Sequence, residues 1–137
     1  MRRNVFPVAA LAAVVVTTGC SGTVSSQQDA AAGAAVRFEA DAGAAPGAAC
    51  AALTPAARED LARGGSCVRG LVAARLPSSP DERQGAGRVE VYGDHAMVGL
   101  GADTVFLVRA GNRWLVTAAG CTSRGADRPY DCRVDGS

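Results

Sequence analysis

Residues 88–120 read RVEVYGDHAMVGLGADTVFLVRAGNRWLVTAAG, and this stretch decides the fold. Apolar side chains recur along it with a period of two, which is the pattern of strands with a buried face. We predict four strands, at residues 88–92, 95–100, 104–109 and 113–119. Short turns separate them, at Gly93-Asp94, Gly101-Ala102 and Gly111-Asn112. Because turns this short join only antiparallel neighbours, the sequence predicts an antiparallel meander.

The two-residue turns also predict how the strands align. A turn at Gly93-Asp94 sets Val91 opposite Ala96 and Val89 opposite Val98. The turn at Gly111-Asn112 gives three further pairs, which are Arg109 with Trp114, Leu107 with Val116 and Val105 with Ala118. Side chains directly across an antiparallel pair share a face, so these pairs sort the residues into two faces.

One face of the predicted sheet is apolar and the other is mixed. The apolar face holds Val89, Val91, Ala96, Val98, Val105, Leu107, Trp114 and Val116. The mixed face holds Glu90, Tyr92, His95, Met97, Phe106, Val108, Leu115 and Thr117. Because the third strand is apolar on both sides, we expect the mixed face to be packed by helices or to line a cavity. The side chains expected to line such a cavity are Tyr92, His95, Met97, Phe106 and Leu115, and they suit a small, largely apolar ligand.

Helix signals precede the meander. An alanine-rich run at residues 30–42 carries an apolar stripe anchored by Phe38, with Asp29 as its N-cap. A continued Ala/Gly linker is the alternative for this run. A Gly/Pro break at residues 43–47 and a short helical turn at 48–53 follow.

Two further helices have clear start signals. Thr54-Pro55 offers a hydroxyl N-cap and a proline at the first helical position, and predicts a helix to residue 63. Ser66 caps another helix at residues 67–74. The predicted fold class is therefore α+β, with three or four N-terminal helices packed on a four-stranded antiparallel meander.

The first twenty residues have the pattern of a bacterial export signal. Arg2 and Arg3 precede an apolar stretch at residues 5–16, which as a helix spans about 18 Å and is too short for the roughly 30 Å hydrocarbon core of a membrane. Thr17-Thr18-Gly19-Cys20 resembles the lipobox, the cleavage motif of bacterial lipoproteins, in which small residues precede the cysteine that carries the lipid. It departs from the pattern at Thr17, where an aliphatic residue is usual. An ordinary secretory signal with an incidental cysteine is the alternative.

This pattern divides the chain into three parts. We expect a signal peptide at residues 1–19, a flexible tether at 20–29, which is small and polar, and one small domain at 30–137. The mature protein would then lie on the outer (extracytoplasmic) face of the cell membrane, anchored through a lipid on Cys20.

The other four cysteines predict two disulfides. Cys50, Cys67, Cys121 and Cys132 are an even number in an exported domain, which is typical of a disulfide framework. Three pairings are possible from the count alone. We expect Cys50–Cys67, joining the short turn to the last helix, and Cys121–Cys132, closing the tail; a helix-to-tail bond such as Cys50–Cys121 is the alternative. The separations of 17, 54 and 11 residues contain no CxxC-like cluster, so no metal site is expected.

Charge argues against nucleic acid as a partner. The chain has 14 arginines and no lysine, against 13 acidic residues, and two of the arginines lie in the signal. A protein that binds phosphates needs several clustered cations, and the sequence contains no basic stripe.

No catalytic constellation is evident, and no cofactor is expected. The single histidine, His95, follows Asp94, but neighbours on a strand point to opposite faces and cannot act as a pair. Glu90 and Tyr92 share a face with His95, so an acid–base site at a cavity mouth is the alternative to a polar sheet face.

The last predicted strand and the tail after it resemble the end of a known group of sequences. The sequence WLVTAAGC at residues 114–121, followed by PYDC at 129–132, is similar to small uncharacterised actinobacterial lipoproteins that end in W-x-V-x-A-A-G-C and P-Y-D-C. More widely, the order of helices and meander resembles the nuclear-transport-factor-like (cystatin-like) cone. That fold hosts isomerases, cyclases and binding modules, so it does not decide function.

These observations favour a membrane-tethered, non-enzymatic binding or accessory module of the cell envelope. Its partner would be a small apolar ligand or an envelope protein, and the sequence does not indicate an oligomeric state. The alternative is a cone-type enzyme, isomerase- or cyclase-like, that acts on a small apolar substrate through Tyr92, Glu90 and His95.

Overall fold

The computed structural model describes residues 21–77 and 85–136. The predicted signal peptide and Cys20 lie outside the described residues. None of the described helices is long and apolar enough to cross a membrane.

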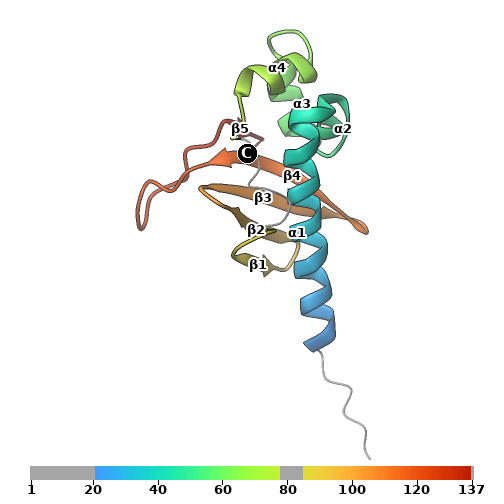
Figure 1. Cartoon of the computed structure of the whole chain (residues 1–137), viewed down its shortest axis with the longest axis vertical. Coiled ribbons are helices and arrows are strands. Elements are labelled where there is room, and N and C mark those ends of the chain that lie inside the picture. The colour runs from blue at the N-terminus through green and yellow to red at the C-terminus, as the bar shows by residue number, and fades with distance from the viewer. Residues whose placement is uncertain (1–20, 78–84, 137) are drawn as a thin grey trace, which may run out of the picture.

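The described chain folds as α+β, the predicted class (Figure 1). The helices are α1 (Ser21–Ala44), α2 (Pro46–Ala51), α3 (Pro55–Ala62) and α4 (Cys67–Ala74). The strands are β1 (Val89–Tyr92), β2 (His95–Leu100), β3 (Asp103–Ala110), β4 (Arg113–Cys121) and β5 (Val134–Asp135). They form one antiparallel sheet in the order β1-β2-β3-β4-β5, so the predicted four-stranded meander is extended by β5.

The prediction of a flexible tether at residues 20–29 is wrong for its described part, because α1 begins at Ser21. Asp29 therefore lies inside the helix and is not its N-cap. Once the later turns of α1 are fixed by packing, adding residues to the helix costs little, even for a small and polar sequence. A contact with the sheet also supports this end, since the Gln28 side-chain amide donates a hydrogen bond to the Val89 carbonyl at 3.3 Å.

The predicted caps of α3 and α4 are confirmed. The Thr54 hydroxyl accepts a hydrogen bond from the Ala57 backbone N–H, and the Ser66 hydroxyl accepts one from Arg69, both at 3.3 Å. Each bond satisfies one of the backbone donors that a helix leaves free at its start. The short turn expected at residues 48–53 is a helix that begins earlier, at Pro46.

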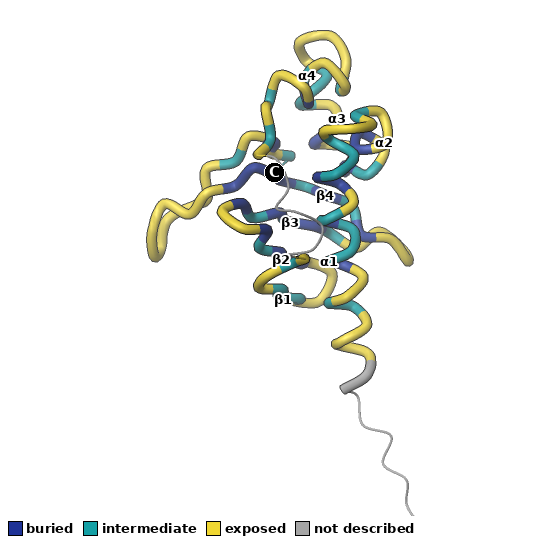
Figure 2. The backbone as a smooth tube through the Cα atoms, viewed as in Figure 1, coloured by how far each residue is buried: buried dark blue, intermediate teal, exposed yellow. Residues whose placement is uncertain are grey.

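α1 packs on the apolar face of the sheet, where it runs across β1, β2, β3 and β4, and α3 contacts β4 and β5 (Figure 1). The largest side chains buried there include Phe38, Leu53, Val98, Val105, Leu107 and Val116, each at most 1% exposed. Figure 2 shows the buried segments along the central strands and the exposed segment after β4. Burying several such side chains, at about 1.5–3 kcal/mol each, is the main source of stability in so small a domain.

Most of the predicted register is confirmed, including the pairs of β1 with β2. The expected pair of Val105 with Ala118 is wrong, because Ala118 lies opposite Phe106. A bulge at Thr117 adds one residue to β4. Beyond the bulge, the alternation of apolar residues therefore no longer predicts which residues of β3 and β4 are paired. A second shift follows at Gly120, whose backbone N–H donates to the buried carboxylate of Asp103 at 3.2 Å.

Both expected disulfides are present. Cys50 is bonded to Cys67 and links α2 to α4. Cys121 is bonded to Cys132, and this bond closes the tail that follows β4 into a ring. The tail then returns to the sheet as β5. Val134 of β5 pairs with Ala119 and is 1% exposed, so the tail contributes to the core as well as to the surface.

Candidate functional site

The predicted mixed face of the sheet exists, but none of the described helices covers it. Strand pairing places its residues side by side: Tyr92 opposite His95, Glu90 opposite Met97, Met97 opposite Phe106, and Val108 opposite both His95 and Leu115. Tyr92 is 65% exposed, His95 is exposed, and Met97, Phe106 and Leu115 are half-buried. Of the two alternatives for this face, packed helices or a cavity, the described helices do not supply the first, because α1 packs on the other side of the sheet.

The tail makes an open groove on this face instead. The groove has a volume of about 350 Å³, within the range of small-ligand sites. Of the five residues expected to line a cavity, His95 and Phe106 line the groove. Tyr92, Met97 and Leu115 are not among its lining residues.

Tyr130 forms the tail side of the groove. Its ring meets the Phe106 ring edge-on, with the ring centres 5.0 Å apart. Its hydroxyl lies 3.8 Å from the Met97 sulfur. The lining side chains are mainly apolar, so the groove suits an apolar group held by burial, with the His95 ring and the Tyr130 hydroxyl available to orient it.

Glu90 and Tyr92 form a polar pair at the edge of the same face. The Tyr92 hydroxyl donates a hydrogen bond to Glu90 Oε2 at 2.5 Å, and Arg88 forms an ion pair with Glu90. The hydrogen bond from Tyr92 lowers the pKa of Glu90, with a smaller contribution from Arg88, and the same bond raises the pKa of Tyr92. Within the described residues no hydrogen bond joins His95 to either side chain, and all three are accessible to water, so they do not enclose a reacting group.

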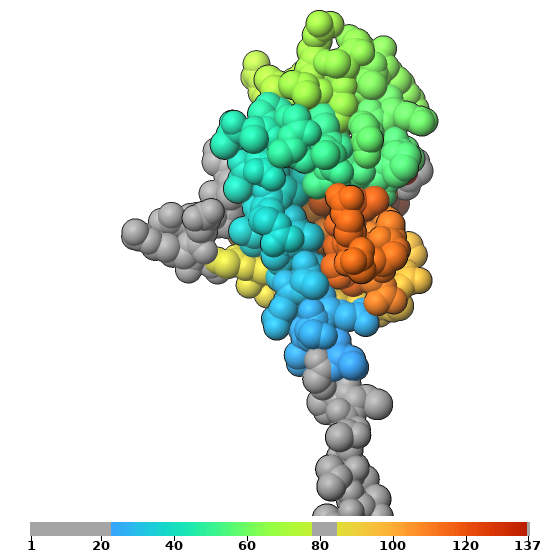
Figure 3. All heavy atoms as spheres, turned by 90° about the vertical axis from the view of Figure 1, so that its right-hand side faces the viewer, coloured from blue at the N-terminus to red at the C-terminus, as the bar shows by residue number. Residues whose placement is uncertain are grey.

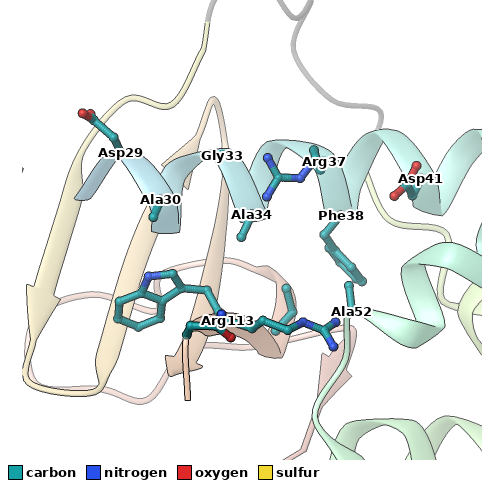
Figure 4. Close-up of a pocket in the computed structure, with 12 residues that line it drawn as sticks. Asp29, Ala30, Gly33, Ala34, Arg37, Phe38, Asp41, Ala52 and Arg113 are labelled. Carbon is teal, nitrogen blue, oxygen red and sulfur yellow. The ribbon is translucent and has the colours of Figure 1, made fainter. Parts of the chain in front are cut away.

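A second groove, which the sequence did not predict, lies between α1 and β4. Figure 3 shows α1 and the β3–β4 hairpin side by side on this face of the molecule. The groove has a volume of about 310 Å³ and an apolar floor that includes Phe38 and Trp114. Arg37 on α1 and Arg113 on the hairpin stand on opposite walls (Figure 4).

This groove forms because α1 has small side chains where it crosses β4. Ala30, Gly33 and Ala34 line it, and Trp114 approaches from the sheet. Gly33 is the one sequence signal that could have indicated it, since a glycine inside an alanine-rich helix costs about 1 kcal/mol relative to alanine. The position of α1 over β4 depends on tertiary packing, which the sequence pattern does not specify.

Within residues 21–77 and 85–136, no group of three or more His, Cys, Asp or Glu side chains is placed to hold a metal ion. Comparisons of the chain with protein-family models, with curated proteins and with solved structures return no match.

Proposed function

We propose that this chain is a bacterial lipoprotein, anchored by Cys20 to the outer face of the cell membrane, whose domain binds a partner without catalysing a reaction. The signal-like residues 1–19 and the lipobox-like Thr17-Thr18-Gly19-Cys20 support the anchor. The two disulfides support an oxidising compartment, in which such bonds persist. The resemblance of residues 114–132 to small actinobacterial lipoproteins points the same way.

The observation that carries the binding role is the group of accessible apolar side chains on the mixed face of the sheet. Apolar side chains that stay accessible on a folded domain mark contact sites more often than a random surface does. Here the helices leave that face open, and Phe106 and Tyr130 frame a ligand-sized groove on it. The proposed partner is apolar where it enters the groove, either a small molecule or a side chain of an envelope protein. The sequence contains no basic stripe that would support nucleic acid as a partner.

The alternative of a cone-type enzyme has one observation in its favour, the short hydrogen bond between Tyr92 and Glu90. General acid–base catalysis needs the reacting group held next to the proton donor or acceptor, with water excluded. Glu90, Tyr92 and His95 lie on an open sheet surface, which favours the binding module.

The test is a thermal-shift screen of small apolar molecules against residues 21–137. A ligand at 100 times its dissociation constant stabilises the folded state by about 2.7 kcal/mol, which raises Tm by on the order of 10 °C in a domain of this size. Phe106→Asp should abolish the shift. Val72→Asp is the matched control, because Val72 is an apolar residue that is 59% exposed on α4, away from the groove.

Other outcomes would contradict parts of the proposal. A shift that is lost in Arg113→Gln and kept in Phe106→Asp would place the ligand in the groove between α1 and β4. Turnover of a bound compound that disappears in His95→Ala would show an enzyme.

A further inference from the structure

The first turns of α1 extend past the edge of the sheet. Gln28 marks the crossing point, because its side chain bonds to Val89 of β1, the edge strand. Val24 lies one turn earlier on the same side of the helix and is 56% exposed. Figure 1 shows this end of α1 projecting beyond β1. An exposed apolar side chain therefore sits just outside the sheet, beside its edge.

The opposite end of α1 lies beside α4. Ala40, Gly43 and Ala44 line a shallow hollow together with Val72 of α4. Since an α-helix rises 1.5 Å per residue, Gln28 and these residues are about 18–24 Å apart along the helix axis. The β1 edge and the α4 end are thus at opposite ends of the domain, as Figure 1 also shows.

The chain leaves little length between the proposed anchor and the β1 edge. Cys20 is followed directly by Ser21, the first residue of α1. The rise from Ser21 to Gln28 is about 10 Å. The headgroup layer of one leaflet is roughly 5–8 Å thick, because the whole bilayer is about 40–45 Å and its hydrocarbon core about 30 Å. A helical link of this length holds β1 close to the headgroups and α4 well away from them.

We propose that the β1 edge, with Val24 and Tyr92, faces the membrane surface and that α2, α3 and α4 face away from it. This orientation rests on the proposed lipid anchor at Cys20. Tyr92 is exposed on the edge strand, and tyrosine is one of the side chains enriched at membrane interfaces. Within the described residues β1 pairs only with β2, and the same orientation shields its outer edge from pairing with a strand of another chain.

The test uses the full-length lipidated protein in phosphatidylcholine vesicles that carry a nitroxide quencher on the headgroup. Trp114 is the single tryptophan, so Trp114→Phe gives a dark background. Tyr92→Trp then reports on the β1 edge, and Val72→Trp, at another exposed position, reports on α4. We expect the headgroup quencher to remove at least half of the Tyr92→Trp emission and to leave the Val72→Trp emission nearly unchanged.

A break in the first turns of α1 should remove the difference in quenching between the two tryptophan reporters. Proline in the interior of a helix interrupts it, so Ser26→Pro should make the quenching of the two reporters similar, whereas Ser26→Ala should not. A difference that persists in Ser26→Pro would overturn the role given to α1.

The failures of the orientation and of the anchor are distinguishable by flotation. Protein that floats with the vesicles and shows equal quenching at both reporters overturns the orientation and leaves the anchor standing. Protein that does not float with the vesicles overturns the anchor, and the orientation with it.

Discussion

Gly70 of α4 lies against the backbone of α3 at Leu61. A Cβ built at Gly70 would lie 2.2 Å from the backbone oxygen of Leu61, closer than any real contact. Gly70→Ala should therefore force the two helices apart and lower the free energy of unfolding by about 1–3 kcal/mol, which a denaturant titration would measure. Gly64→Ala is the control, because a Cβ there meets nothing within 4 Å. Equal stabilities of the two variants would contradict this packing.

The Tyr92–Glu90 hydrogen bond gives a prediction about pH. That bond is the largest cause of the lowered pKa of Glu90, so Tyr92→Phe should raise this pKa toward the ordinary value of a glutamate. A lowered carboxyl pKa stabilises the folded state above the unfolded pKa, and this contribution is lost as pH falls through the folded pKa. An NMR titration of the Glu90 carboxyl carbon measures the change. An unchanged pKa in Tyr92→Phe would show that Arg88 supplies the effect.

At the scale of single residues, the sequence predicted what depends on near neighbours. The Thr54 and Ser66 caps act on backbone groups three residues away, so their role follows from the local sequence. The buried Asp103 was not predicted, because only one of its two partners is local: Oδ1 accepts from the neighbouring Thr104 N–H at 2.6 Å, whereas Oδ2 accepts from the Gly120 N–H on β4. Oδ2 therefore finds its partner only when the bulged part of β4 reaches it.

The two disulfides stabilise different elements. In the chain-entropy argument a ring closed over 11 or 17 residues contributes about 3 kcal/mol. Replacing Cys121 and Cys132 by serine should lower the free energy of unfolding by about that amount and release the tail. Amide exchange should then be faster at Val134 than at Leu107 in the centre of β3. Unchanged protection at Val134 would mean that β5 holds without the bond.

At the scale of elements, local signals predicted α3, α4 and the first four strands. The glycine turns fixed the hairpins, and the change of period from helical to alternating separated the two halves. The start of α1 was missed because its composition is that of a linker. The helical structure there is supported by a contact with β1, which the sequence pattern does not show. β5 was missed because two residues carry no periodicity, and their pairing with Ala118 and Ala119 is formed across the disulfide-closed tail.

At the scale of the molecule, the sequence predicted that one face of the sheet is apolar and the other mixed, but it left open whether helices or a cavity would meet the mixed face. Both faces of β3 are apolar enough to be buried, so the outcome depends on where α1 and the Leu53 segment pack. The candidate groove was predicted only in part for the same reason. His95 and Phe106 lie in it, and the wall opposite them comes from the tail, at Tyr130.

The location of the domain and its orientation both depend on the proposed anchor at Cys20. Intact-mass spectrometry of the mature protein, purified from the membrane fraction without reduction, tests it most directly. We expect a chain that begins at Cys20, carries a diacylglyceryl group on that residue, and has four hydrogens fewer than the reduced chain because of its two disulfides. An unmodified chain that begins at another residue would contradict it.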